Sequence, residues 1–378
     1  MIAVDFNWIL IRYGEIGLKS DYVRKSFENR LINNIREGLK TRGFDGKVKR
    51  GYGRIFVSTS EVKKASEVLE HTFGVVSFSP CIKIEADFEG VVKKLADLAS
   101  DHISKKDTFA VRVRRTGNHD FSSKDVEKEA GSRILEETDA EVDLDDPDER
   151  VMADIRQGQC YVFREKISGP GGLPIGTQGR VVSLFRGDCG SFLATWMMMK
   201  RGCSVTLLIG SMDPYSADIS TGALEELKKW DHGSPLDVLD FDHGVNLFRF
   251  SEDGEKGYVC VLCKRFLHRL ASRVAEDRDA KAIVSGDHLQ ENFDSFKLTD
   301  SVVNIPVIRP LVGFGKDEIR SKCREVGGEF ILKEHGCEAE DRDTFDVKGK
   351  RLEEIEEKLD IEEMVEESFV EAIPDEDT

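Results

Sequence analysis

The run Gly169-Pro170-Gly171-Gly172-Leu173-Pro174 most constrains the fold of this 378-residue chain, because it separates two different patterns of secondary structure. Glycine and proline cluster here, where neither a helix nor a strand can continue, so the run predicts a linker. Before it, short alternating strands are separated by amphipathic helices, as in an α+β region. After it, buried strands alternate with longer helices, which is typical of a doubly wound parallel sheet.

Several elements can be assigned from hydrophobic spacing. Residues 9–13 read as a strand, and residues 21–39 have apolar side chains four apart on one helical face. A helix is expected over residues 123–137, with Ser122 or Ser123 as its N-cap. Beyond the linker, the sequence predicts buried parallel strands at 180–185, 204–209, 282–285 and 307–310, with helices at 192–200, 264–276 and 316–325 between or after them.

Charge is distributed unevenly along the chain. The 55 Lys and Arg against 72 Asp and Glu give a net charge of −17, which by itself argues against a nucleic-acid partner. Residues 1–60, however, hold 12 basic and 6 acidic side chains, whereas residues 351–378 hold 2 and 13. The amino-terminal region can therefore present a basic face, and the carboxy-terminal segment is expected to be a solvated acidic helix and tail.

Composition also excludes some classes of protein. No stretch approaches the roughly 20 uncharged apolar residues that a membrane span requires, so we expect a cytoplasmic protein without a membrane partner. The 8 cysteines are too sparse for a disulfide scaffold, and only Cys260 and Cys263 stand close together in the sequence.

Three segments contain residues that could bind phosphate, ligate a metal or react as thiols. Residues 186–191 (RGDCGS) join a predicted strand to a helix, and on spacing alone they form either a plain turn or a phosphate-binding loop. The Cys260-x-x-Cys263 pair is compatible with redox thiols, half of a metal site or two packed thiols. Cys337, in the string KEHGC, is either an isolated thiol or a reactive one.

Residues 181–209 (VVSLFRGDCGSFLATWMMMKRGCSVTLLI) resemble the PP-loop segment of the tRNA 4-thiouridine synthetase family. The chain keeps Gly187, Ser191 and the Met-Lys-Arg-Gly-Cys string, and it departs at Arg186, Asp188 and Gly190, where the family has Ser, Gly and Asp. Further similarity lies in the IRYGEI string at residues 11–16, in FAVRVRR at 109–115 and in GPGGLPIGTQG at 169–179.

The resemblance implies a fold, which is multidomain α+β followed by α/β. The implied parts are an N-terminal ferredoxin-like domain at 1–85, a THUMP RNA-binding domain at 86–168, a Gly/Pro linker at 169–179, a doubly wound parallel-sheet PP-loop domain (adenine nucleotide α-hydrolase-like) at 180–350, and an acidic C-terminal helix and tail at 351–378.

The resemblance also implies site residues. Cys260, Cys263 and Cys337 would be catalytic and would ligate an iron–sulfur cluster. Expected contacts to ATP with Mg are Leu184, Phe185, Gly187, Ser191, Ile209, Lys264 and Gly286. Expected contacts to tRNA are Arg112, Arg114, Arg115, Lys19 and Arg24, whose charges suit phosphates.

The implied activity is sulfur transfer to a tRNA uridine after ATP-dependent adenylation, with a sulfur donor protein or free sulfide, and a homodimer is possible. The departures at Arg186, Asp188 and Gly190 favour an alternative, in which the chain is a degenerate tRNA-binding pseudoenzyme or an accessory subunit of another modification enzyme. A third hypothesis keeps the cluster but not adenylation. The three retained cysteines favour sulfur transfer over a binding role alone.

Overall fold

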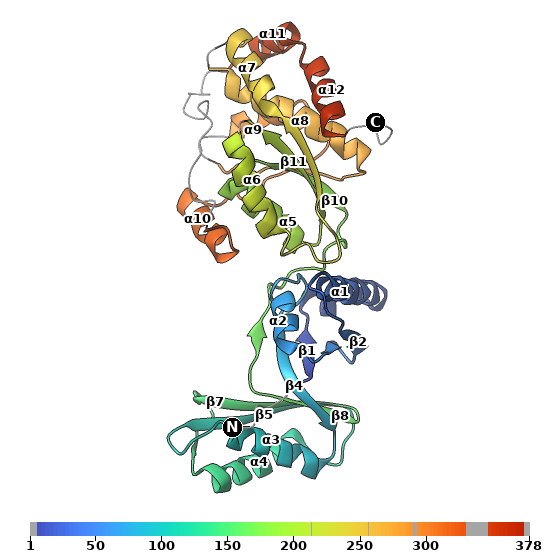
Figure 1. Ribbon diagram of the computed structural model, residues 1–378, viewed down its shortest axis with the longest axis vertical. Coiled ribbons are helices and arrows are strands. Elements are labelled where there is room, and N and C mark those ends of the chain that lie inside the picture. Colours follow the sequence, from blue (N-terminus) through green and yellow to red (C-terminus); the bar gives the residue numbers. More distant parts are fainter. Residues whose placement is uncertain (1–5, 213, 256, 290–292, 330–346, 374–378) are drawn as a thin grey trace. The chain divides into compact units, whose positions relative to one another are not determined.

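The computed structural model describes residues 6–212, 214–255, 257–289, 293–329 and 347–373 (Figure 1). It divides into two compact units, Met1–Leu173 and Pro174–Thr378, and the boundary falls within the Gly/Pro run. In the part of the chain that is described, no helix combines the length and apolar character needed to cross a membrane.

The first unit begins with an antiparallel sheet of order β2-β3-β1-β4. Its strands are β1 (Trp8–Arg12), β2 (Lys47–Gly51), β3 (Arg54–Ser58) and β4 (Ser77–Glu85). Helices α1 (Asp21–Thr41) and α2 (Val62–Glu70) pack on it, and α1 buries Leu31, Ile35 and Leu39 against Ile9 and Ile11. The helix predicted at 21–39 is therefore confirmed, and its apolar stripe is the face that contacts the sheet.

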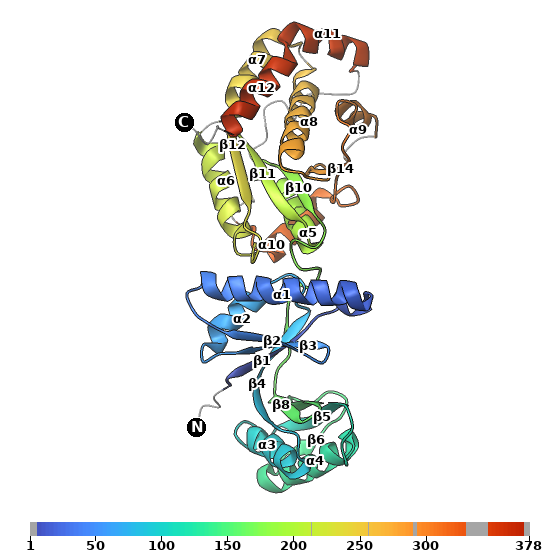
Figure 2. The ribbon, with the colours of Figure 1, turned by 90° about the vertical axis from the view of Figure 1, so that its right-hand side faces the viewer.

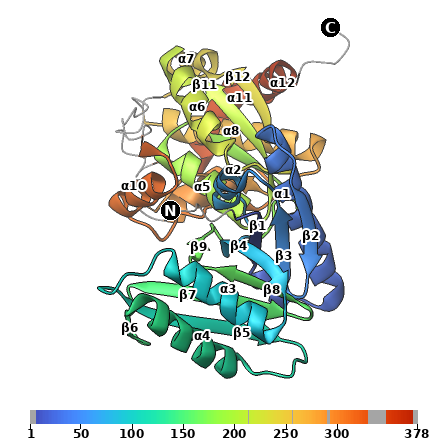
Figure 3. The same cartoon turned by 60° about the horizontal axis from the view of Figure 1, so that its bottom comes forward.

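Strand β4 continues into a second half of this sheet. Residues 77–81 pair with β1, whereas residues 82–85 pair with β8, so one strand belongs to both halves. The second half contains β5 (Thr108–Thr116), β6 (Glu141–Val142), β7 (Glu149–Arg156) and β8 (Gln159–Phe163), and the short β9 (Ile167–Ser168) pairs back with β4. Helices α3 (Phe88–Ser100) and α4 (Ser123–Thr138) cover these strands (Figure 3). Ser122 caps α4 through a capping box with Asp125.

The second unit is built on a five-stranded parallel sheet of order β12-β11-β10-β13-β14. Its strands are β10 (Arg180–Phe185), β11 (Ser204–Ser211), β12 (Asp237–Asp242), β13 (Ile283–Val284) and β14 (Val307–Ile308). This order confirms the predicted doubly wound fold, and its direction reverses between β10 and β13. Ligands of such sheets bind outside the carboxyl ends of the strands at that switch point.

Helices cover both faces of this sheet. On one face, α5 (Cys189–Lys200) packs on β10 and β11, α6 (Pro214–Leu227) packs on β11, and α10 (Lys316–Glu325) packs on α5. The others are α7 (His243–Asp253), α8 (Val259–Asp277), α9 (Phe293–Asp300), α11 (Gly349–Leu359) and α12 (Ile361–Ala372). Sequence patterning did not reveal β12 and α7, because the alternating string DVLDFD of β12 is short and rich in aspartate, and carries little hydrophobic signal.

The acidic carboxy-terminal segment is part of the core of the second unit. Helices α11 and α12 lie along α7 and α8 (Figure 2), with Leu352, Ile355 and Met364 buried. Glu356 is also buried, and both its carboxylate oxygens accept hydrogen bonds from Arg265 and Arg269 of α8 at 2.6–2.9 Å. The acidic residues on the outer sides of α11 and α12 face solvent, as expected for an amphipathic helix.

Candidate functional site

The loop after β10 lies at the switch point of the parallel sheet. Gly187 has φ +73°, and a Cβ there would lie 2.8 Å from the Cα of Ser220 on α6. Glycine is required on both grounds, because the left-handed backbone and the close approach each disfavour a side chain. The turn that follows points the amino end of α5 toward the carboxyl edge of the sheet.

Asp188 ends this loop as the N-cap of α5. Its Oδ1 accepts a hydrogen bond of 2.7 Å from the backbone N–H of Ser191, and its Oδ2 pairs with Arg186 at 2.8 Å. Burial opposes ionisation of Asp188, but Arg186 and the hydrogen bonds from Ser191 outweigh it and hold the pKa of the carboxyl below its ordinary value. The two residues that depart from the resembled motif therefore compensate each other's charge.

Gly190 and Gly286 lie in backbone contact. A Cβ on Gly190 would be 2.8 Å from the carbonyl oxygen of Gly286, and one on Gly286 would be 2.5 Å from the backbone nitrogen of Ser191. The amino end of α5 therefore packs directly on the chain leaving β13. This close packing gives a physical reason for glycine at position 190.

Lys264 and Asp287 form an ion pair beside these glycines. Lys264 Nζ lies 3.1 Å from Asp287 Oδ1, and Ser285 donates a 2.7 Å hydrogen bond to Asp287 Oδ2. Burial opposes ionisation of Asp287, but Lys264, Arg186 and Ser285 together hold its pKa below the ordinary value. Burial likewise opposes the charge on Lys264, but Asp287 and the thiol of Cys260 raise its pKa.

Cys260 and Cys263 lie in the first two turns of α8, one turn apart on the same side and partly exposed. The amino end of a helix favours thiolates, and Lys264 follows directly. The Nε2 of His243, the first residue of α7, lies 3.1 Å from the Sγ of Cys263. Burial lowers the pKa of His243 to about 4, although Asp242 opposes the shift, so the ring is neutral at pH 7.

The third expected cysteine, Cys337, lies outside the described residues. Among those that are described, no group of three or more His, Cys, Asp or Glu side chains is arranged to hold a metal ion. The described pair nevertheless fits an iron–sulfur ligand set in its chemistry, because two partly exposed thiols share one helical turn beside a cation.

The remaining expected nucleotide contacts lie along the same edge of the sheet. Phe185 ends β10 and pairs with Ile209 of β11, and both side chains are buried. Leu184 is only partly buried and packs against the core on the α8 side. The expected nucleotide contacts thus come from three neighbouring segments. Leu184 and Phe185 end β10, Gly187 and Ser191 lie in the loop and the first turn of α5, and Gly286 follows β13.

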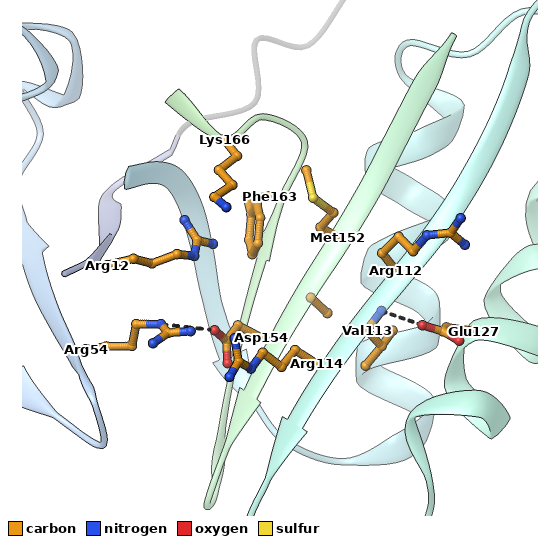
Figure 4. Close-up of a pocket in the computed structure, with 11 residues that line it drawn as sticks. Arg12, Arg54, Arg112, Val113, Arg114, Glu127, Met152, Asp154, Phe163 and Lys166 are labelled. Atoms are coloured by element: carbon orange, nitrogen blue, oxygen red, sulfur yellow. Dashed lines mark hydrogen bonds and ion pairs between the residues drawn. The ribbon is translucent and has the colours of Figure 1, made fainter. Parts of the chain in front are cut away.

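A basic pocket occupies the first unit, between β1 and β3 on one side and β5, β7 and β8 on the other (Figure 4). It is open and has a volume of about 240 Å³. Five basic side chains line it, namely Arg12, Arg54, Arg112, Arg114 and Lys166, against two acidic ones, Asp154 and Glu127. Such an excess of positive charge in one concave surface suits a polyanion.

Two of these arginines are held in place by partners inside the pocket. Arg54 Nε lies 3.4 Å from Asp154 Oδ2, and Arg12 stacks over the ring of Phe163 at 4.9 Å (Figure 4). Burial, and then the neighbouring charge of Arg54, lower the pKa of Arg12 to about 10. The crowding of like charges means that an anion bound here would relieve repulsion as well as form ion pairs.

The five residues expected to contact RNA do not all meet in this pocket. Arg112 and Arg114 alternate on the exposed face of β5 and line it. Arg115 points to the other face, where its Nη1 donates to the carbonyl oxygen of Gly117 at 3.2 Å. Lys19 is exposed just before α1, and Arg24 pairs with Asp21 in the first turn of that helix.

Sequence reasoning missed several residues of both sites. In the second unit it missed His243 and the pairing of Asp287 with Lys264. In the basic pocket it missed Arg54, Asp154 and Lys166. Each of these residues meets side chains that are distant in sequence. The alternating pattern of β5 predicted that Arg112 and Arg114 lie on its exposed face. No local pattern indicated which other strands would contribute side chains to the same pocket.

Comparison with known proteins gives a consistent picture. Residues 176–361 match the family described as "Thiamine biosynthesis protein (ThiI)", residues 8–79 match the ThiI ferredoxin-like domain and residues 85–165 match the THUMP domain. The chain is 34% identical over 353 residues to a probable tRNA sulfurtransferase of Methanothermobacter thermautotrophicus, covering 89% of this chain and 90% of that one. It is 36% identical over 335 residues to one of Thermococcus kodakarensis, covering 85% and 88%.

Solved structures agree with these matches. A 4-thiouridine synthetase, crystallised in complex with RNA and with bound ATP, superposes with a TM-score of 0.86 at 27% identity, covering 97% of this chain and 98% of that one. A protein of Pyrococcus horikoshii superposes with a TM-score of 0.70 at 30% identity, covering 85% and 99%.

Proposed function

The chain belongs to the tRNA sulfurtransferase family, and from that premise we propose that it replaces the C4 oxygen of a tRNA uridine with sulfur after ATP-dependent activation. One observation carries the proposal. The Gly187 loop, the Lys264–Asp287 pair and the Cys260-x-x-Cys263 thiols all meet at the switch point of one parallel sheet, where such folds bind ligands. A tRNA substrate implies that the protein acts in the cytoplasm.

The nucleotide half of the site would serve the activation step. The O4 of the uridine attacks the α-phosphate of ATP and displaces pyrophosphate, so that O4 can later leave as AMP. The amino end of α5 would stabilise phosphate charge, and Lys264 would add a cation to it. Because Arg186 compensates Asp188, the loop carries no net negative charge toward the phosphates.

The cysteine half of the site would supply sulfur. Cys260, Cys263 and Cys337 would hold an iron–sulfur cluster, which when bound offers an open iron for the sulfide to be transferred. Lys264 lies directly beside the two described thiols, so the activated base and the sulfur can meet at one edge of the sheet. The source of sulfur would be free sulfide or a donor protein.

The first unit would bind the tRNA. The basic pocket, with Arg112 and Arg114 on its rim, supplies phosphate contacts that depend on charge rather than base sequence. The ion pair between Arg186 and Asp188 and the close packing of Gly190 on Gly286 account for the three departures in the loop without a catalytically inactive role.

The test is an anaerobic assay with reconstituted protein, unmodified tRNA transcript, ATP with Mg and sulfide, read by nucleoside mass spectrometry. Wild type should form 4-thiouridine, and Cys260→Ala, Cys263→Ala and Cys337→Ala should each abolish it. Cys203→Ala, at a buried thiol that ends the loop after α5, is the control and should retain it. Sulfur transfer is excluded if thiolation survives all three changes, and a wild type that binds tRNA without thiolating it would favour the binding role.

A further inference from the structure

His243 is held rigidly at the carboxyl end of β12. It is 3% exposed and follows Asp242, whose carboxylate caps α7 by accepting from Gly244 at 2.9 Å. The imidazole lies nearly parallel to the ring of Phe266, with centroids 5.6 Å apart, and meets the rings of Phe241 and Phe250 at steep angles. Three aromatic side chains therefore fix the plane of the imidazole, and Nε2 lies 3.1 Å from the sulfur of Cys263.

The other ring nitrogen has a different environment. Nδ1 of His243 is buried and has no hydrogen-bond partner among the residues that the structure describes. A neutral imidazole carries one N–H, so the proton is either on Nδ1 or on Nε2. A proton on Nδ1 would leave a buried donor unsatisfied, which native structures rarely tolerate, whereas a bare lone pair there is tolerated more often.

The favoured tautomer therefore carries its proton on Nε2. That N–H lies within reach of the sulfur of Cys263, and a cysteine sulfur accepts a hydrogen bond more strongly as a thiolate or a metal-bound thiolate than as a neutral thiol. Sulfur with this character is what a cysteine that ligates an iron–sulfur cluster needs.

We propose that His243 is a positioning residue, whose Nε2–H donates a hydrogen bond to the sulfur of Cys263 and fixes that sulfur in its reactive orientation. The inference rests on the proposed function, in which Cys263 would be one of the cluster ligands. It assigns to an aromatic-lined histidine, 20 residues away in sequence, the role of orienting one of the thiols at the amino end of α8. Hydrogen bonds to a cysteine sulfur also raise the reduction potential of a cluster that it ligates.

The first test needs neither cluster nor activity. Nitrogen-15 spectra of metal-free wild-type protein, labelled in histidine and assigned with His243→Gln, report which ring nitrogen carries the proton. The expected result is the Nε2-protonated tautomer of His243 at neutral pH. An Nδ1-protonated ring would overturn the proposal, since Nε2 would then accept from the thiol.

The second test compares variants of reconstituted protein. His243→Leu removes the donor, and we expect thiolation to fall roughly 10- to 100-fold and the midpoint potential of the cluster to become more negative, with ATP and tRNA affinities unchanged. His243→Gln keeps an N–H donor and should recover part of both properties, which a merely space-filling role would not predict. Val245→Ala, at an exposed position on the same helix, is the matched control.

The outcomes separate the two proposals. Unchanged thiolation and potential in His243→Leu would overturn the role of His243 while leaving sulfur transfer intact. If His243→Leu does not fold, the tautomer and the His243→Gln potential still decide the role. Absence of thiolation in the wild type would instead count against the proposed function, and the tautomer measurement would still determine whether the hydrogen bond exists.

Discussion

The ammonium group of Lys264 lies 3.1 Å from the carboxylate of Asp287, and this ion pair joins the helix that carries the two cysteines to the chain leaving β13. Both side chains are partly buried, with 34% of Lys264 and 16% of Asp287 exposed. Burial opposes the charge on Lys264, but Asp287 and then the thiol of Cys260 raise its pKa, so the proposed nucleotide contacts and the proposed cluster ligands would share one cation.

Replacing Lys264 should therefore affect ATP binding and stability together. Lys264→Met leaves the Asp287 carboxylate partly buried without its main cation, and we expect a loss of about 1–3 kcal/mol in stability and at least about tenfold in ATP affinity. Calorimetric titration with ATP and Mg, together with denaturant unfolding, measures both. Lys264→Arg should be milder because the charge remains. Lys281→Met removes an exposed lysine on the same unit and should change neither, and equal ATP affinity in Lys264→Met and wild type would remove Lys264 from the nucleotide site.

The close packing of Gly190 on Gly286 should not tolerate a methyl group. In Gly190→Ala the new Cβ would lie 2.8 Å from a backbone carbonyl oxygen, so α5 must shift away from β13. We expect the free energy of unfolding to fall by about 1–3 kcal/mol. ATP should also bind more weakly, because the amino end of α5 moves. Gly131 lies within α4, and nothing lies within 4 Å of a Cβ added there. Gly131→Ala should instead stabilise the protein by about 0.5–1 kcal/mol. A neutral Gly190→Ala would contradict the close packing.

The basic pocket predicts a salt-dependent complex with tRNA. Arg112→Gln and Arg114→Gln should each weaken binding, and the slope of log affinity against log salt should fall by about 1 for each phosphate that is no longer neutralised. Fluorescence anisotropy at several salt concentrations measures the slope. Arg133→Gln, on α4 and paired with Glu89, is the control and should leave the slope unchanged. An unaltered slope in the two pocket variants would place the RNA elsewhere.

Glu356 should stabilise the second unit in a pH-dependent way. Burial opposes its ionisation, but hydrogen bonds and charges from Arg265 and Arg269 outweigh burial and hold its pKa below the ordinary value of 4.5. Since the folded-state pKa is depressed, the stabilisation is fully present above about pH 4.5 and is lost as pH falls through the lower folded-state value.

Glu356→Gln should therefore cost about 3–5 kcal/mol of unfolding free energy at pH 7, because the buried Arg265 and the partly buried Arg269 lose the anion that they share. The difference from wild type should shrink below about pH 4.5. Denaturant unfolding at both pH values measures it. Glu354→Gln, at a half-exposed ion pair with Arg351, should change stability by no more than about 1 kcal/mol at either pH. A pH-independent difference would mean that Glu356 acts through packing alone.

Local patterns in the sequence determined most of the secondary structure. The 3.6-residue spacing of α1, the capping residue Ser122 and the nearly uninterrupted apolar run of β10 each depend on neighbours within a few positions, so they can be read without the fold. The same is true of the Cys260-x-x-Cys263 spacing and of Gly187, whose left-handed backbone follows from one tight turn.

Tertiary structure alone decided which of these features meet. His243 reaches Cys263 because β12, which the sequence did not reveal, lies at the edge of the sheet and delivers α7 to the amino end of α8. Arg12 and Arg54 join Arg112 and Arg114 because β4 is shared by two halves of one sheet. Sheet order and strand register are set by burial summed over residues far apart in sequence, so the charges and thiols that they bring together leave no local trace in the chain.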